Sequence, residues 1–318
     1  MSGCGNHPRK LKIFSGRSHP DLAEEICRIR DTPVGKSVVV RFSNENLMVQ
    51  IKENVRGADV FVVQTSAPPV NEGLVELLIT LDALKHTSAD RITAVIPYFP
   101  YVRSDKKDKP RISITARLIA DLLQTSGADR VLTMDLHAPQ IQGFFRIPVD
   151  HLHATPVITE YLLNGDLSNA VLVAADAGEA KDVGRYANLL HLPMAIIDKR
   201  RHDDSEKATP THLIGVVDGK DAIIIDDEVA TGGTLVEAAT FLKSHGARTI
   251  RAAFTHAVLS RDSVQRIDDS CIDEVIFTDT VPLQGKTSPK FKIVSVAEIF
   301  ARAIRRIHDG DSLSELFR

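Results

Sequence analysis

Residues 222–234 read Ala222-Ile-Ile-Ile-Asp-Asp-Glu-Val-Ala-Thr-Gly-Gly-Thr234, and a helical pattern follows over Leu235–His245. A short apolar run, a polar turn with two adjacent glycines and a longer periodic segment predict a strand that leads through a tight loop into a helix. Strands that alternate with helices in this way form parallel sheets covered by helices. This stretch therefore predicts an α/β fold.

The same alternation continues along the chain. Asn71–His86 and Ser113–Ser126 have apolar residues at the helical period, with Leu118 and Leu122 expected on the buried face of the second helix, and Gly127 is placed to cap that helix. The segments between helices are short, β-branched and almost wholly apolar, which is typical of strands buried on both faces of a parallel sheet. The predicted strands are Ser37–Arg41, Val60–Gln64, Ile92–Ile96, Val131–Met134, Val171–Ala175, Met194–Ile197, Ala222–Ile225 and Ile250–Phe254.

A weak internal repeat is present. Gly127-Ala128 begins a predicted strand that reaches His137 ten residues after the glycine, and Gly246-Ala247 begins another that reaches His256 at the same spacing. Each follows a predicted strand, loop and helix. The repeat predicts two related α/β halves with a boundary near His151–Thr159.

The composition is that of a folded globular protein. The chain has 318 residues, of which 43% are hydrophobic and 25% charged, and the net charge of −3 gives no basic footprint for nucleic acid or an anionic membrane. Cys4, Cys27 and Cys271 are far apart and form neither a CxxC pair nor a metal-binding spacing. No apolar stretch is long enough to cross a bilayer, and Met1–Lys10 lacks a signal-peptide core, so a cytoplasmic location is expected.

The loop that ends at Thr234 has the chemistry of a sugar-phosphate site. A helix N-terminus offers unpaired N–H groups to an anion, and Gly232 and Gly233 let the backbone approach it closely. Asp226 and Asp227 are expected at the carboxyl end of the strand, where they suit sugar hydroxyls or a bridging cation rather than phosphate. The GxxxxGK[ST] phosphate-binding pattern is absent.

Beyond this loop, the chain resembles the ribose-phosphate pyrophosphokinase family, also called phosphoribosyl pyrophosphate synthetases. The loop alone is shared with type I phosphoribosyltransferases, but further segments match the pyrophosphokinases in order across nearly the whole chain. These segments are Arg41-Phe-Ser-Asn-Glu-Asn46, Glu53-Asn-Val-Arg-Gly57, Val95-Ile-Pro-Tyr-Phe-Pro-Tyr-Val-Arg103, Gly127-Ala-Asp-Arg-Val-Leu-Thr-Met-Asp-Leu-His137, Gln140-Ile-Gln-Gly-Phe-Phe145 and Ile197-Asp-Lys-Arg-Arg201.

The resemblance implies two phosphoribosyltransferase-like halves and a definite reaction. Residues 8–152 are expected to form the N-terminal domain, 153–305 the C-terminal domain, and 306–318 a tail that docks on the N-terminal domain or on a neighbour. The implied reaction converts ATP and ribose 5-phosphate into AMP and phosphoribosyl pyrophosphate, with Mg²⁺ as cofactor. It also implies a homo-oligomer, commonly a hexamer, whose nucleotide site a neighbouring subunit completes, with phosphate or nucleotide effectors.

Site residues follow from the resemblance position by position. Lys199, Arg201 and His137 are the expected catalytic residues, because cations near a polyphosphate stabilise the charge that develops during transfer. The ribose 5-phosphate site is expected to comprise Arg201, Asp226, Asp227, Ala230, Thr231, Gly232, Gly233 and Thr234. The ATP site is expected to comprise Phe42, Asn44, Glu45, Asn46, Arg103 and Ser104, the metal site His137 and Asp176, and the effector site Arg56, Ser312 and Ser314.

Several positions depart from the family pattern. Ala230 stands where a third acid is usual, and Ser104, Glu179, Asn46 and His151 also replace common residues. The Ala230 form of the loop leaves open a phosphoribosyltransferase as the alternative enzyme. The substitutions around both substrates leave open a regulatory subunit that has lost its activity.

Overall fold

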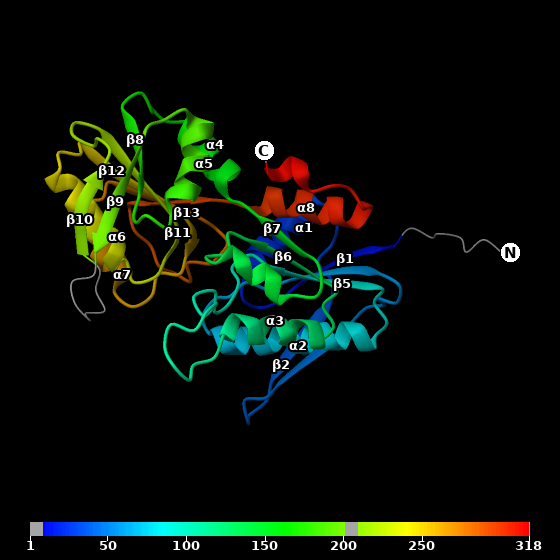
Figure 1. Cartoon of the computed structure of the whole chain (residues 1–318). Coiled ribbons are helices and arrows are strands. Elements are labelled where there is room, and N and C mark those ends of the chain that lie inside the picture. Colours follow the sequence, from blue (N-terminus) through cyan, green and yellow to red (C-terminus); the bar gives the residue numbers. More distant parts are fainter. Residues whose placement is uncertain (1–8, 201–208, 318) are drawn as a thin grey trace. The chain divides into compact units, whose positions relative to one another are not determined.

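The computed structural model describes residues 9–200 and 209–317, and its contacts divide the chain into two compact units. The first unit comprises residues 1–152 together with 297–318, and the second comprises residues 153–296 (Figure 1). The second unit begins where the sequence analysis placed the C-terminal domain. It ends earlier than expected, because residues 297–305 belong to the first unit rather than to the second.

The first unit contains a parallel sheet with strand order β1-β4-β5-β6-β7 and a separate antiparallel hairpin, β2-β3. An isolated parallel bridge joins Ile13 of β1 to Val34, on the edge of β1 opposite to β4. The elements are β1 (Leu11–Ser15), α1 (Pro20–Ile29), β2 (Ser37–Arg41), β3 (Leu47–Ile51), β4 (Asp59–Val63), α2 (Val70–His86), β5 (Arg91–Ile96), α3 (Thr115–Thr125), β6 (Arg130–Met134), η1 (Pro139–Phe144), β7 (Val149–Leu152), α8 (Ala297–Asp309) and η2 (Ser314–Phe317).

The second unit contains one sheet with strand order β10-β9-β8-β11-β12-β13-β14, in which β10 alone runs antiparallel to its neighbour. The central strands β8 and β11 have fully buried apolar segments, as predicted for strands covered on both faces. The elements are α4 (Thr155–Leu163), β8 (Ala170–Ala174), α5 (Ala180–Leu190), β9 (Met194–Arg200), β10 (Thr209–Ile214), β11 (Asp221–Val229), α6 (Gly233–Ser244), β12 (Thr249–Ala257), α7 (Ser263–Asp268), β13 (Glu274–Thr278) and β14 (Phe291–Val294).

The strand order of both units reverses once. In the second unit the chain passes from β8 to β9 on one side, and then from β11 through β12 and β13 on the other. Crossovers between parallel strands are right-handed, so crossovers in opposite directions place α5 and α6 on opposite faces of the sheet. In the first unit β1 leads to the bridge at Val34 on one side, while β4, β5 and β6 continue on the other. Figure 1 accordingly shows α1 with α8 across this sheet from α2 and α3.

Two related halves are therefore present, but the predicted repeat paired strand–helix–strand segments that are not equivalent. By its position in the sheet, β4-α2-β5 of the first unit corresponds to β11-α6-β12 of the second. The sequence repeat had instead paired β5-α3-β6 with β11-α6-β12. His137 after β6 and His256 at the end of β12 are consequently not equivalent. The glycines that suggested the repeat share a more general role, because Gly127 and Gly246 both have positive φ between a helix and the next strand.

The predicted elements are confirmed in type, with three corrections. Ser37–Arg41 is a strand, but it lies in the two-stranded hairpin, with two of its five residues exposed and none fully buried, rather than in a buried parallel sheet. In α3 the buried face is formed by Ala116, Ile119, Ala120 and Leu123, so the prediction that Leu118 and Leu122 are buried was wrong. The strand predicted to end at Ile225 continues to Val229, because its last residues pair with β12 up to Ala257.

The helix α8 is held to the first unit by a buried ion pair. The carboxylate of Asp59 is fully buried at the start of β4 and accepts bonds from Nε of Arg91 at 2.7 Å and from Nδ1 of His308 at 2.8 Å. Nη2 of Arg91 also donates to the carbonyl oxygen of Ile307 at 2.7 Å. A second contact closes the tail onto this helix, since Nη1 of Arg306 donates to the Ser312 carbonyl at 2.9 Å. In the part of the chain that the structure describes, no helix combines the length and apolar character needed to span a bilayer.

We predict that Arg91→Met lowers the free energy of unfolding of the first unit by about 3–5 kcal/mol, because it leaves the buried Asp59 carboxylate without its guanidinium partner. Urea unfolding gives the free energy, and hydrogen exchange of the α8 amides reports whether the helix detaches first. The matched control is Arg305→Met, which removes an exposed pair with Asp309 on the same helix. Equal effects of the two substitutions would contradict the anchoring role of Arg91.

Candidate functional site

The loop between β11 and α6 presents a row of backbone donors. Gly232 precedes the helix with φ 73°, a left-handed conformation that glycine adopts without strain. The N–H groups of residues 231–234 donate no hydrogen bond to any acceptor in the described residues. Because these groups stand at the positive end of the α6 dipole, they form an anion-binding turn.

The loop is fixed in this shape by the chain that follows β12. The carbonyl of Ala230 accepts a bond from the N–H of Ser260 at 2.8 Å. The carbonyl of Val229 accepts two more, from Val258 at 3.0 Å and from Leu259 at 3.1 Å. These bonds satisfy the loop's carbonyls within the second unit and hold its backbone in place.

Three carboxylates gather next to this turn. Oxygens of Glu179, Asp226 and Asp227 all lie within 4.8 Å of one another, and all three residues are half-buried. Asp226 and Asp227 stand on β11, and Glu179 ends the turn that leads from the neighbouring strand β8 into α5. The cluster therefore lies where the strand order reverses, which is the usual ligand position in open α/β sheets.

The pKa of Asp226 lies well above its usual range. Burial is the largest cause, and the charges of Asp227 and Glu179 add to it, while the backbone N–H of Asp227, at 2.8 Å from Oδ1, opposes it. Carboxylates this close repel one another when ionised. Three hard oxygen donors at this spacing suit a divalent cation such as Mg²⁺, which would relieve the repulsion.

Asp176, the predicted metal ligand of this unit, lies in the same β8–α5 turn as Glu179. Its Oδ1 accepts the N–H groups of Gly178 at 2.7 Å and Glu179 at 3.2 Å, which closes the turn and orients the Glu179 backbone. Asp176 is not a member of the three-carboxylate cluster found among the described residues. Its metal role stays a prediction.

The predicted catalytic cations are only partly described. Lys199 lies near the end of β9, where its backbone pairs with that of Pro210 on β10. Arg201 lies outside the described residues. Their roles therefore stay predictions.

The residues predicted to contact ATP lie in the first unit at two places. Phe42, Asn44, Glu45 and Asn46 form the tip of the β2-β3 hairpin, where the N–H of Phe42 donates to the Asn46 carbonyl at 2.9 Å and 48% of Phe42 is exposed. Figure 1 shows this hairpin extending beyond α2. An exposed aromatic ring at the end of a projecting hairpin can stack on a base.

The other place is the carboxyl edge of the sheet. Arg103 and Ser104 follow β5, His137 follows the adjacent parallel strand β6, and the side chains of Arg103 and His137 are exposed. The carbonyl of Ser104 accepts the N–H of Ala116, which ties this loop to α3. Parallel neighbouring strands thus bring these residues to one edge, apart from the hairpin tip.

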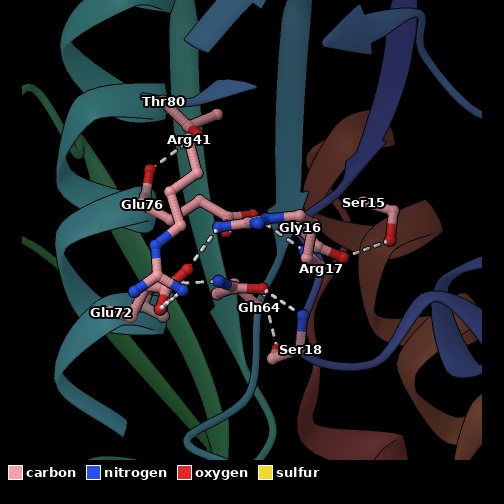
Figure 2. Close-up of polar contacts among 10 residues, drawn as sticks. Ser15, Gly16, Arg17, Ser18, Arg41, Gln64, Glu72, Glu76 and Thr80 are labelled. Atoms are coloured by element: carbon pink, nitrogen blue, oxygen red, sulfur yellow. Dashed lines mark hydrogen bonds and ion pairs between the residues drawn. The ribbon is translucent and has the colours of Figure 1, made fainter. Parts of the chain in front are cut away.

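In the first unit the equivalent of the ligand crevice, between β1 and β4, is filled by side chains (Figure 2). Glu76 is 2% exposed and accepts bonds from Nε of Arg17 at 2.7 Å and from its N–H at 2.8 Å. The Gln64 amide is also buried, and its oxygen accepts the Ser18 hydroxyl at 2.7 Å. A side chain at Gly16 would overlap the Gln64 amide, so little space remains for a ligand.

The same network continues to the hairpin. Glu72 pairs with Arg17 at 3.0 Å and with Arg41 at 3.6 Å, and Arg41 pairs with Glu45 at 3.1 Å. Charges therefore alternate from the buried Glu76 to the hairpin tip, partly visible in Figure 2. Sequence analysis did not find this network, because its members are separated by up to 59 residues and form no local pattern.

A sheet whose order reverses beside an anion-binding turn and flanking carboxylates defines the class of α/β proteins with phosphoribosyltransferase-type folds. Residues 11–127 match the family model for the N-terminal domain of ribose phosphate pyrophosphokinase. Residues 204–318 match that for the phosphoribosyl synthetase-associated domain. The chain belongs to the ribose-phosphate pyrophosphokinase family.

Individual relatives support this membership over the full length. A ribose-phosphate pyrophosphokinase of Clostridium acetobutylicum is 49% identical, with 98% of this chain and 99% of the relative covered. One from Caldanaerobacter subterraneus subsp. tengcongensis is also 49% identical at the same coverage. The crystal structure of phosphoribosylpyrophosphate synthetase from Mycobacterium smegmatis superposes with a TM-score of 0.89 at 39% identity, covering 95% of this chain and 100% of that one.

We predict that Asp226→Asn stabilises the metal-free protein at pH 8. A raised folded-state pKa means that the ionised carboxylate costs stability above that pKa, and that this cost disappears below the unfolded pKa of about 3.9. The gain in melting temperature should therefore shrink as the pH falls from 8 toward 4. Thermal unfolding in the presence of EDTA measures it, and a variant less stable than wild type at pH 8 would contradict the electrostatic account.

Proposed function

We propose that this protein is a ribose-phosphate diphosphokinase, which converts ATP and D-ribose 5-phosphate into AMP and 5-phospho-α-D-ribose 1-diphosphate. The observation that carries the proposal is the match, over 98% of this chain, to a relative named ribose-phosphate pyrophosphokinase. In the reaction the C1 hydroxyl oxygen of ribose forms a bond to the β-phosphorus of ATP. The bond from that phosphorus to the α,β-bridging oxygen breaks, AMP leaves with this oxygen, and the hydroxyl proton passes to solvent.

The anion-binding turn takes the 5-phosphate in this proposal. The support is the row of N–H groups at residues 231–234 that lack acceptors among the described residues. Asp226 and Asp227 then face the ribose hydroxyls, for which carboxylates are good acceptors. The sugar phosphate is thus bound at both ends, which orients C1 for attack.

Mg²⁺ is the proposed cofactor, and Glu179, Asp226 and Asp227 are the residues whose donor chemistry fits it best. When bound, the ion supplies charge neutralisation to the diphosphate. Predicted ligands His137 and Asp176 belong to this proposal as well, with His137 acting through phosphate or water, because imidazole is a poor ligand for Mg²⁺.

Lys199 and Arg201 are proposed to stabilise the negative charge that develops on the transferred diphosphoryl group. The hairpin residues Phe42, Asn44, Glu45 and Asn46 are proposed to bind the adenine of ATP in a second copy of the chain. This is supported by the exposure of Val38, Phe42 and Met48 (42%, 48% and 39%), which leaves an apolar surface on the hairpin. A homo-oligomer, commonly a hexamer in this family, phosphate or nucleotide effectors and a cytoplasmic location complete the proposal.

The activity is tested by incubating the pure protein with ATP, Mg²⁺ and ribose 5-phosphate, and by following AMP chromatographically. AMP should form only when the sugar phosphate is present. We predict that Lys199→Ala lowers kcat by about two orders of magnitude or more, because it removes a charge that acts in the transition state, while ribose 5-phosphate still binds. Absence of AMP from the wild-type protein would sink the proposed activity, and a change confined to KM would refute the role of Lys199.

The metal site is tested through Glu179. We predict that Glu179→Gln raises the Mg²⁺ concentration for half-maximal activity about tenfold, because one of three anionic donors becomes neutral. It should also reduce the rise in melting temperature that Mg²⁺ produces. Glu237→Gln, an exposed glutamate on α6, is the matched control and should leave both quantities unchanged. Equal Mg²⁺ dependence in the two variants would place the ion elsewhere.

A further inference from the structure

The proposed phosphate-binding turn contains no positively charged residue. It contributes backbone donors and hydroxyls but no cation of its own, while three carboxylates lie beside it. A phosphate dianion brought to this position is attracted by the donors of the turn and repelled by the carboxylates. A positive side chain near the amino end of α6 would therefore change the affinity for the sugar phosphate strongly.

The short helix α7 packs directly against the turn. A Cβ atom placed on Gly232 would lie 3.6 Å from the carbonyl oxygen of Ser263 and 3.6 Å from Cγ1 of Ile267. Ser263 and Ile267 are one helical turn apart and both are fully buried. The face of α7 that carries them is therefore pressed onto the glycine of the loop.

Arg266 lies at the edge of this face. A Cβ atom placed on Gly233 would lie 3.3 Å from Nη1 of Arg266 and 3.7 Å from Oγ1 of Thr231. One arm of the guanidinium thus lies over the first residue of α6, on the side that also carries the Thr231 hydroxyl. The side chain is 42% exposed, so solvent and a ligand can both reach it.

The other arm is held in place by Asp262. Nη2 of Arg266 donates to Oδ2 of Asp262 at 2.8 Å, across one turn of helix. This contact is the one ion pair of Arg266 in the described part of the chain, and it lowers the pKa of Asp262. A guanidinium fixed by one arm presents its remaining donors in a constant direction.

We infer that Arg266 is a binding residue for the 5-phosphate of the sugar substrate, with Asp262 as the residue that positions it. The inference rests on the proposed function for the identity of the sugar phosphate. Nη1 of Arg266 supplies the positive charge that the turn lacks and contacts phosphate oxygens together with the N–H groups of α6. Arginine suits this task because its planar donors match phosphate oxygens.

The test compares Arg266→Gln and Arg266→Lys with wild type. Arg266→Gln should raise both the KM and the calorimetric dissociation constant of ribose 5-phosphate about 10- to 100-fold, the usual effect of losing a hydrogen bond to a charged group. The KM for ATP and the melting temperature should stay close to wild type. Arg266→Lys should recover part of the affinity, and Asp262→Asn should weaken it to a smaller extent.

Arg28→Gln is the matched control, since Arg28 makes the same kind of intrahelical pair, with Glu25 at 2.8 Å, in α1 of the first unit. It should leave every one of these constants unchanged. Unchanged ribose 5-phosphate affinity in Arg266→Gln would overturn the inference, and so would an equal loss of affinity for ATP and ribose 5-phosphate. Calorimetry separates this from the proposed activity, because a protein that binds ribose 5-phosphate through Arg266 but forms no AMP refutes only the latter.

Discussion

The site depends on the reversal of strand order between β8 and β11. Because the chain leaves these neighbouring strands in opposite directions, right-handed crossovers put α5 and α6 on opposite faces. No helix then covers the gap between the two strand ends, and both turns open into it. Glu179 enters from one turn, and Asp226, Asp227 and the free N–H groups of residues 231–234 enter from the other. The polar groups of the candidate site are thus concentrated where the topology leaves a crevice.

The first unit has the same reversal of strand order, but its crevice is filled by side chains. Its loop between β4 and α2 ends in Pro68-Pro69, so two of the four positions that correspond to residues 231–234 have no N–H donor for an anion. The crevice itself holds Arg17, which pairs with Glu76, and Gln64, whose amide accepts the N–H of Ser18 and donates to the Gly73 carbonyl (Figure 2). A fold that creates a crevice therefore does not create a site, because the residues at the strand ends decide whether the space receives a ligand or is filled by ion pairs.

The sequence allowed the elements with strong local signals to be predicted. The helix Val70–His86 and the strands β4, β5, β6 and β8 were predicted within one or two residues, and the turn between β11 and α6 was placed correctly, because periodicity and paired glycines are local. The buried strand β13 (Glu274–Thr278) was not predicted. The edge strands β7 and β14 were missed, since each has only four residues and is incompletely buried. The edge strand β10 was missed as well. The extension of β11 to Val229 was missed because pairing with β12, not composition, keeps polar residues in a strand. The repeat was assigned one strand–helix–strand segment out of register, since turns with a positive-φ residue follow several helices, at Ser88, Gly127, His191 and Gly246.

The substitution at Ala230 does not by itself predict how many carboxylates line the crevice. From its resemblance to the family, this chain was expected to have one carboxylate fewer near the ribose, and the substitution at Glu179 was noted as a separate departure. In the structure the carboxylate of Glu179 lies beside those of Asp226 and Asp227, so three acids surround the crevice although one turn supplies only two of them. Ala230 instead contributes through its backbone, because its carbonyl accepts a hydrogen bond from the N–H of Ser260 and so fixes the turn. The two departures are thus linked through space, because the charge in the crevice is set by both turns together and neither turn predicts it alone.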